Sequence, residues 1–322
     1  MNHRVFGRTG WPLGEVGYGM WGLAGWTGSD DEESLESLQL SIDLGCNFFD
    51  TAAAYGDGRS ERILGKVLRA NDKKLYAATK IPPKNRTWPS QRGFKLDDVF
   101  PADHIREFAE RSLGNLGVAR IDLLQFHVWE DDWADDDRWR RAIDDLKRQD
   151  LIAAVGVSIN RWEPENGLRT VRSGAIDSVQ VIYNIFDQAP EDELFPACGE
   201  VGVAVIARVP FDEGSLAGTL TKETTWPEGD WRNGYFVPEN LAATVDRVER
   251  LKPLVPPGST LPELAIRFIL SNRDVAVVIP GMRKPAHVRA NVAAANAGPL
   301  SSDMIARLRE HRWDRTPTAW SQ

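Results

Sequence analysis

Short runs of apolar residues recur along the chain, and longer amphipathic segments separate them. Residues 35–44, for example, carry apolar side chains at the spacing of a helix, shortly after a capping candidate at Asp30. Alternation of strands and helices predicts βαβ units with a parallel sheet, whose buried strands are almost continuously apolar. The eight predicted strands are residues 16–19, 47–50, 75–80, 121–127, 153–158, 178–183, 203–208 and 275–280.

Eight strands with seven or eight intervening helices favour a closed (β/α)8 barrel over an open doubly wound sheet. A length of 322 residues would also fit two domains, but the barrel uses all of it, so we expect a single domain over residues 1–322. Residues 210–237 have no clear period, and a loop of this length is typically a lid or a locally folded excursion. Residues 304–309 predict an amphipathic C-terminal helix closing over the barrel, followed by Trp313 and Trp320.

Composition and charge narrow the class of protein. Hydrophobic residues make up 42% of the chain and charged residues 27%, as in a folded globular protein. The net charge of −8 argues against unspecific binding to nucleic acid or anionic lipid, and no apolar segment approaches a membrane span, so we expect neither partner. Cys46 and Cys198 are too few for a disulfide scaffold, which indicates a reduced, cytoplasmic protein. The oligomeric state is not indicated.

Four polar residues lie at or just after the carboxyl ends of neighbouring predicted strands: Asp50, Tyr55, Lys80 and His127. Each alone has an ordinary explanation as a turn cap, a packed ring, a solvated cation or a core histidine. That end of a barrel carries the active site, so we expect them to converge. A buried Lys80 would pair with Asp50 and lower the pKa of Tyr55. Tyr55 would then exchange a proton with a carbonyl oxygen that His127 orients.

Longer motifs extend the pattern over nearly the whole chain. They are N-F-F-D-T-A-A-A-Y-G (47–56), S-E-R-I-L-G (60–65), T-K (79–80), D-L-L-Q-F-H (122–127), G-V-S (156–158), Q-V-I-Y-N (180–184) and I-P-G-M-R-K-P (279–285). Together they resemble the signature of the aldo-keto reductase family. The resemblance implies an α/β fold, namely a (β/α)8 TIM barrel. An N-terminal β-hairpin, a C-terminal helix and lid loops would accompany the barrel. The resemblance also implies an enzyme that reduces an aldehyde or ketone with NAD(P)H, and the four polar residues match the family's catalytic tetrad, with Tyr55 as general acid.

The resemblance also assigns a nicotinamide cofactor. Arg283 and Lys284 precede a helix that starts at Pro285, and cations at a helix N-terminus bind anions well. The family match favours the adenosine 2′-phosphate at Arg283, hence NADP(H), with NAD(H) as the alternative. It places residues 210–218 along the pyrophosphate. The other cofactor-binding candidates are Ser158, Asn160, Gln180, Arg208, Pro210, Gly214, Leu216, Gly281, Met282, His287 and Asn291.

Two positions depart from the family pattern. Ile159 stands where many members have Asn, so either Asn160 replaces that amide or the contact is absent. Arg208 stands where many members place an aromatic ring against the nicotinamide. An arginine there can stack on a ring or bind a phosphate.

Three tryptophans are candidates for the walls of a substrate pocket: Trp21, Trp88 and Trp129. Flat aromatic walls suit a sugar or an aromatic carbonyl compound as the small-molecule substrate. The cations of the long loop 81–94 are expected to be solvated. The acidic residues 130–132 and 135–137 are interpreted as an acidic surface at the start of a helix and not as a metal site.

Three other functions fit the same residues. One is a dehydrogenase that works in the oxidising direction on a sugar. Another is a nicotinamide-binding, redox-sensing subunit of a larger assembly. The third is a barrel isomerase or lyase that holds a phosphorylated substrate at Arg283.

Overall fold

The computed structural model describes residues 1–25 and 30–316, so Trp320 lies outside the described residues. Eight parallel strands form one continuous sheet in the order β10-β9-β8-β7-β6-β5-β4-β3. The strands are β3 (Tyr18–Gly19), β4 (Phe48–Asp50), β5 (Tyr76–Ile81), β6 (Ile121–Phe126), β7 (Ile152–Ser158), β8 (Ser178–Ile182), β9 (Ala204–Arg208) and β10 (Val275–Val278). All eight predicted strands are confirmed, and no end differs from its prediction by more than two residues.

The sheet closes on itself where β3 meets the end of β10. The Gly17 amide donates to the Val278 carbonyl (2.9 Å) and the Gly19 amide to the Pro280 carbonyl (3.0 Å), so the fold is a closed barrel. A side chain at Gly19 would place its Cβ 2.7 Å from the Ile279 carbonyl oxygen. The glycines at 17, 19 and 22 have the Gly-x-Gly-x-x-Gly spacing of open dinucleotide-binding sheets, but Gly17 and Gly19 serve barrel closure here.

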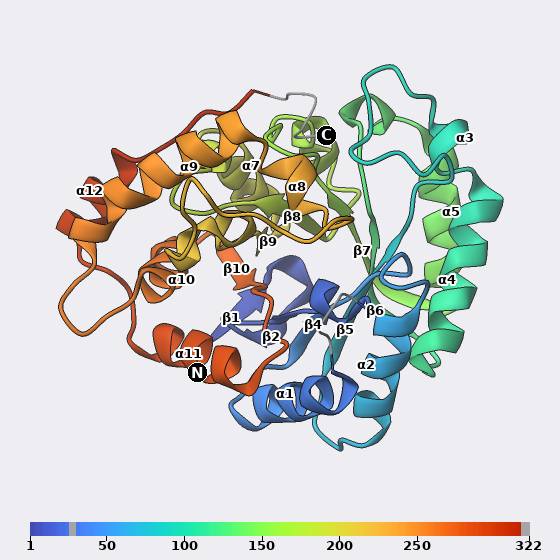
Figure 1. The fold of residues 1–322 in the computed structure, drawn as a ribbon. Helices are drawn as coiled ribbons and strands as arrows, with labels where there is room; N and C mark the ends of the chain where they lie inside the picture. Colours follow the sequence, from blue (N-terminus) through green and yellow to red (C-terminus); the bar gives the residue numbers. More distant parts are fainter. Residues whose placement is uncertain (26–29, 317–322) are drawn as a thin grey trace.

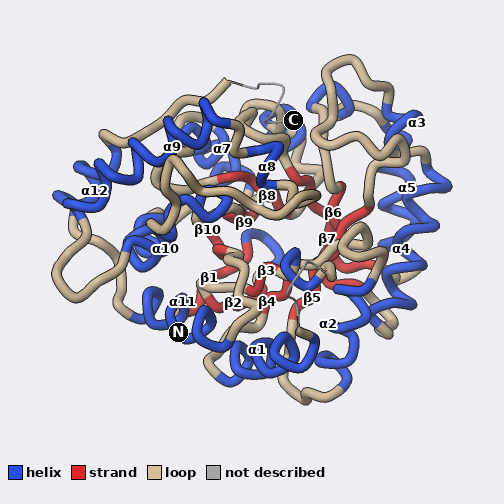
Figure 2. Tube along the Cα trace, in the orientation of Figure 1, coloured by secondary structure: helices blue, strands red, loops and turns tan. Residues whose placement is uncertain are grey.

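Helices surround the strands, which occupy the centre of the molecule (Figures 1 and 2). Those between strands are α1 (Asp31–Asp43), α2 (Arg59–Arg69), α3 (Leu96–Val99), α4 (Ala102–Leu116), α5 (Asp137–Arg148), α6 (Leu168–Arg172), α7 (Leu194–Val201), α8 (Arg232–Tyr235), α9 (Pro238–Leu251) and α10 (Leu261–Ser271). The last two helices, α11 (Pro285–Asn296) and α12 (Ser302–Arg309), follow β10. Local signals set their starts: the Asp30 side chain accepts from the amides of Glu32 and Glu33 and so caps α1.

An antiparallel hairpin of β1 (His3–Phe6) and β2 (Trp11–Gly14) precedes the barrel, as the family resemblance implies. Its side chains Phe6 and Leu13 are fully buried and pack with strand residues such as Phe48 and Ile206. Apolar side chains therefore fill the barrel interior, and the hairpin covers its amino-terminal end.

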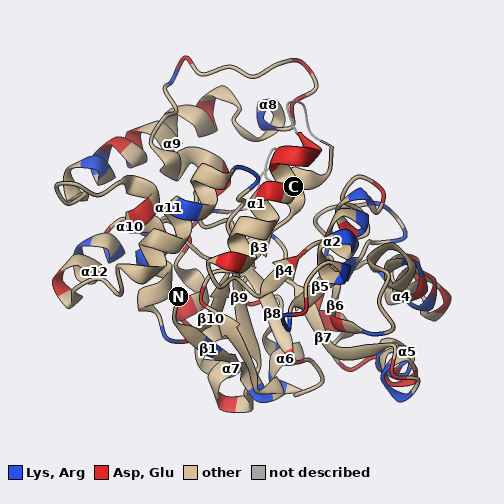
Figure 3. Cartoon of the chain, turned by 90° about the horizontal axis from the view of Figure 1, so that it is seen from below, with Lys and Arg blue, Asp and Glu red and all other residues tan. Residues whose placement is uncertain are grey.

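The C-terminal helix is confirmed, but its position differs from the prediction. Helix α12 packs beside α10 on the outside of the barrel, because its apolar face is short and only Leu308 is fully buried. The tail beyond it reaches back toward the loops: the Trp313 amide donates to the Phe186 carbonyl (2.8 Å). Charged residues of both signs lie along outer helices such as α4 and α5 (Figure 3). Among the described residues, none of the helices combines the length and the apolar character of a membrane span.

Candidate active site

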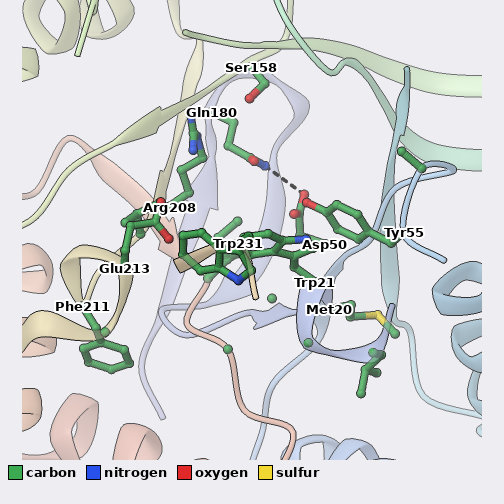
Figure 4. A pocket seen from close by; sticks show the side chains of 18 of the residues that line it. Met20, Trp21, Asp50, Tyr55, Ser158, Gln180, Arg208, Phe211, Glu213 and Trp231 are labelled. Atoms are coloured by element: carbon green, nitrogen blue, oxygen red, sulfur yellow. Dashed lines mark hydrogen bonds between the residues drawn. The ribbon is translucent and has the colours of Figure 1, made fainter. Parts of the chain in front are cut away.

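A cavity of about 970 Å³ opens at the carboxyl ends of the strands. Residues from almost every strand end line it, because parallel strands in a barrel direct their last side chains to one mouth. Figure 4 shows Tyr55 and Asp50 on one side of the pocket and Arg208 and Glu213 on the other. The volume lies within the range of cofactor and substrate sites.

Lys80 and Asp50 form a buried ion pair under the pocket. Lys80 Nζ lies 2.5 Å from Asp50 Oδ2, and it also donates to the Thr51 carbonyl (2.8 Å). The two side chains are only 1% and 4% exposed. Such a pair needs good geometry and further hydrogen bonds to offset the loss of water, and both are present. The predicted pairing is therefore what the structure shows.

Two glutamines complete the environment of Asp50. Gln125 Nε2 (3.1 Å) and Gln180 Nε2 (2.9 Å) both donate to Asp50 Oδ1. The bond from Gln180 is drawn in Figure 4. Gln125 was missed by the sequence analysis, although a polar residue inside the apolar run of β6 is the signal that could have identified it. Each oxygen of the carboxylate is thus held in place.

Tyr55 lies half-buried between this ion pair and the pocket, and Lys80 Nζ is 5.2 Å from its ring centre. Burial raises the pKa of Tyr55, and the nearby Lys80 charge only partly opposes the rise. The expectation that Tyr55 has a lowered pKa is therefore wrong. Lys80 does lower the pKa of Tyr55, but the loss of solvation on burial raises it by more. Tyr55 keeps its proton at neutral pH, as a proton donor must.

His127 lies beside Tyr55, with ring centres 5.7 Å apart in an edge-to-face arrangement. Burial first, and then the charges of Lys80 and Arg208, hold the pKa of His127 well below its usual 6.5. The imidazole is therefore neutral at physiological pH, and its Nδ1 atom is buried with no hydrogen-bond partner among the described residues. A neutral imidazole can donate a hydrogen bond to an oxygen without transferring its proton.

Ser158, Gln180, Asn160 and Arg208 line the pocket beside the tetrad. Asn160 Nδ2 donates to Glu130 Oε1 (2.9 Å), while Asn160 Oδ1 is buried and has no partner in the part of the chain that the structure describes. The prediction that Glu130 lies on an acidic surface is wrong. Glu130 is only 3% exposed, because Asn160 binds its carboxylate in the interior.

Arg208 donates to the Ile159 carbonyl (3.0 Å), and its Nε is buried with no partner in residues 1–25 and 30–316. Burial, assisted by repulsion from Arg161, lowers the pKa of Arg208 to about 10, so the guanidinium is still charged at neutral pH. A buried cation with a free donor can bind an anionic or aromatic group in the pocket.

The basic motif after β10 lies at another edge of the same pocket, where Gly281, Met282, Arg283 and His287 line the cavity. Within the described residues, Arg283 Nη1 is buried without a partner. Asn291 Nδ2 on α11 is also buried without one there, but Asn291 is not among the residues that line the cavity. Buried donors without a partner are costly and mark a place for a ligand. Arg283 Nη1, Asn160 Oδ1 and Arg208 Nε all belong to residues that line the cavity, and they fit a long polar ligand with phosphate and amide groups, such as a nicotinamide nucleotide.

The loop after β9 forms a further wall of the cavity. Pro210, Phe211 and Gly214 line it, whereas Leu216 is buried in the core behind them. Part of residues 210–237, for which the sequence predicts a lid or a locally folded excursion, thus lines the cavity. Glu213 of the same loop, which no sequence pattern singles out, lies beside Arg208 on this side of the pocket (Figure 4) and forms an ion pair with Arg161 (3.2 Å).

The three tryptophan candidates separate. Trp21 and Trp88, 38% and 41% exposed, line the pocket. Trp129 instead lies in the core at 0% exposure, where Nε1 donates to Thr170 Oγ1 (2.8 Å), so it is not brought to the pocket. In its place the structure brings Trp231, whose ring centre is 5.1 Å from that of Trp21 (Figure 4). Trp231 lies in the aperiodic segment, where no sequence pattern identifies it.

Comparisons with known proteins agree with this geometry. The profile of the aldo/keto reductase family matches residues 15–312. An NADH-specific methylglyoxal reductase of Escherichia coli is 29% identical over 92% of this chain and 94% of its own length. The structure of an aldo-keto reductase from Bacillus halodurans, in its holo form, has a TM-score of 0.76 at 27% identity and covers 100% of both chains.

A glycerol dehydrogenase from Gluconobacter oxydans is similar in structure as well. It has a TM-score of 0.76 at 28% identity and covers 94% of this chain and 92% of that chain. The family match over nearly the whole sequence, the closed barrel and the Asp50, Tyr55, Lys80 and His127 cluster lead to one conclusion. The chain belongs to the aldo/keto reductase family and is an NAD(P)H-dependent oxidoreductase.

Proposed function

We propose that the protein reduces an aldehyde or ketone to the alcohol, with Tyr55 as the general acid. The observation that carries the proposal is a protonated, half-buried phenol on the pocket wall, beside a buried Lys80–Asp50 pair and a neutral His127. These groups supply a proton and stabilise the charge that remains after its transfer, which is what carbonyl reduction requires of the protein.

The bound nicotinamide would supply a hydride to the carbonyl carbon. On the protein side, the neutral His127 orients the carbonyl oxygen, and the Tyr55 hydroxyl donates its proton to that oxygen. Lys80 then stabilises the phenolate, while Asp50 and the Thr51 carbonyl keep the ammonium group in position. In the reverse direction the phenolate form of Tyr55, stabilised by Lys80, accepts the proton of an alcohol, and the similarity to a glycerol dehydrogenase makes this direction a second candidate.

The proposal extends to the cofactor. We assign the nicotinamide end to Ser158, Asn160, Gln180 and Arg208, and the pyrophosphate to Pro210, Gly214 and Leu216 in the loop after β9. The adenosine end falls to Gly281, Met282, Arg283, His287 and Asn291. Preference for NADP(H) is supported by Arg283 Nη1, which pairs with none of the described residues and lies next to Lys284 at the start of α11. Because one relative is named NADH-specific, NAD(H) is the alternative to test.

The substrate proposal rests on Trp21, Trp88 and Trp231. Their rings offer flat apolar surfaces next to the polar tetrad, which suits a sugar or an aromatic carbonyl compound. We further propose that the whole chain forms one domain around the barrel.

Titration of the protein with NADPH and with NADH, followed by nucleotide fluorescence, tests the cofactor assignment. A panel of sugar, aromatic and short aliphatic carbonyl compounds, assayed at 340 nm, then tests the reaction. Reduction with a lower KM for NADPH supports the proposal. Tight nucleotide binding with no turnover of any carbonyl or alcohol would contradict it and favour a sensing role.

A further inference from the structure

The C-terminal tail places a buried arginine beside the pocket. The Arg315 side chain is 2% exposed, and its Nη2 lies 2.6 Å from Asp212 Oδ1. Its Nε is 3.4 Å from Asp187 Oδ1, and its Nη1 donates to the Tyr235 hydroxyl (2.9 Å). Its guanidinium carbon also lies 4.2 Å from the ring centre of Trp313. Arginine side chains are rarely buried this completely, because the loss of water is costly. The contacts of Arg315 with three segments therefore indicate a structural role in joining them.

Two partners of Arg315, Asp212 and Tyr235, belong to segments that line the pocket. Asp187 follows β8, and Asp212 belongs to the loop after β9, whose neighbouring residues Phe211 and Glu213 line the cavity. Tyr235 ends α8, the short helix that follows Trp231. Arg315 therefore joins the tail to two walls of the pocket that are far from it in sequence.

The loop after β9 is strained and needs such support. Val209, Asp212 and Glu213 have φ values of 55°, 46° and 54°, in the left-handed region that favours glycine. A β-branched residue such as Val209 rarely adopts this conformation. Strained backbone persists only where surrounding contacts impose it, and the ion pair from Arg315 to Asp212 is one of those contacts.

The charges near Arg315 are balanced and extend to the pocket wall. Glu213 pairs with Arg161 and lies beside Arg208, and all three line the cavity. The cluster consists of three arginines and three carboxylates: Arg161, Arg208, Arg315, Asp187, Asp212 and Glu213. Loss of Arg315 would leave an excess of negative charge beside a site that must accept a phosphorylated ligand.

We propose that Arg315 is a positioning residue for nucleotide binding: it holds the loop after β9 and the Trp231 segment in the shape that binds the cofactor and balances their charge. The inference rests on the proposed function, since it takes the ligand of this pocket to be a nicotinamide nucleotide. Arg315 lines no part of the cavity itself and acts through Asp212 and Tyr235.

The test uses Arg315→Met and Arg315→Lys in the full chain, with NADPH and NADH as the probes. We work at pH 8, because burial raises the pKa of Asp187 to about 6 and its carboxylate is then charged. Arg315→Met should raise the nucleotide Kd about tenfold or more, because a broken buried pair leaves its carboxylates unpaired. At saturating nucleotide, kcat should stay within about threefold of the wild-type value, since the tetrad is unchanged. Arg315→Lys, which keeps the charge without the planar fork, should give an intermediate Kd.

Arg312→Met is the matched control. Arg312 lies on the same tail, but its partners Asp192 (2.6 Å) and Asp314 (2.7 Å) are on the surface and line no part of the cavity. This variant should bind nucleotide like the wild type. If Arg315→Met does not fold, Tyr235→Phe, which removes one hydrogen bond and no charge, should raise Kd about threefold or more.

A folded Arg315→Met protein with a Kd within about twofold of the wild type would overturn the inference, as would an equal loss in Arg312→Met. For Tyr235→Phe, an unchanged Kd has the same meaning. Failure of the wild-type protein itself to bind either nucleotide would refute the proposed function instead, so the two failures are distinguishable.

Discussion

Replacement of Lys80 by methionine should affect stability and catalysis at the same time. The substitution keeps much of the side-chain volume but leaves the Asp50 carboxylate buried with only the amides of Gln125 and Gln180 as donors. Removal of one partner from a buried ion pair typically costs 3–5 kcal/mol. Because the two glutamines still solvate the carboxylate, we expect the lower end, about 3 kcal/mol in the free energy of unfolding.

Urea unfolding followed by tryptophan fluorescence measures this loss, and steady-state carbonyl reduction measures catalysis. We expect kcat/KM to fall about 100-fold or more, because the phenolate of Tyr55 loses its neighbouring cation. Lys73→Met is the matched control. Its ion pair with Asp43 is 3.8 Å long and more than half exposed on both sides, so its loss should cost less than about 1 kcal/mol.

The double variant Lys80→Met/Asp50→Asn separates the two effects. It removes the unpaired charge, so about 1–2 kcal/mol of stability should return while the activity stays low. The reasoning would be refuted if Lys80→Met were no less stable than Lys73→Met, or if it kept wild-type kcat/KM.

Three further predictions follow from the site. Trp129→Ala should lower the free energy of unfolding, measured with urea, by about 3–5 kcal/mol. Trp21→Ala should change KM for the carbonyl substrate in steady-state kinetics and cost little stability. Arg283→Ala should raise KM for NADPH about tenfold or more and leave KM for NADH nearly unchanged, and equal effects on both nucleotides would argue against a phosphate contact. His127 has a lowered pKa in the folded protein, so below about pH 6.5 the unfolded chain takes up a proton that the folded protein does not. The free energy of unfolding should therefore fall between pH 7 and pH 5, and it should fall less in His127→Gln.

Much of the fold follows from the sequence, because buried parallel strands leave short apolar runs that are easy to recognise. The same logic brings Asp50, Lys80 and His127 together, since each is tied to a strand end. Whether the pKa of Tyr55 rises or falls could not be predicted from the sequence. The direction depends on how deeply the side chain is buried, and the loops that bury it have no sequence period.

The walls of the pocket were harder to predict for a related reason. Trp129 lies only two residues beyond His127, yet its ring turns into the core, where Thr170 accepts its hydrogen bond. Trp231 and Glu213 belong to an aperiodic segment, and tertiary contacts alone, including the ion pair from Arg161 to Glu213, bring that segment to the pocket. Side-chain direction in loops is set by such contacts and not by local pattern.

Tyr55→Phe tests the central claim most directly, because it removes one hydroxyl from the proposed proton donor and keeps the ring. The measurement compares nucleotide Kd and single-turnover carbonyl reduction in the variant and the wild type. We predict an unchanged Kd and a rate lower by about 100-fold or more. A variant that binds nucleotide and reduces the carbonyl at the wild-type rate would show that Tyr55 is not the acid.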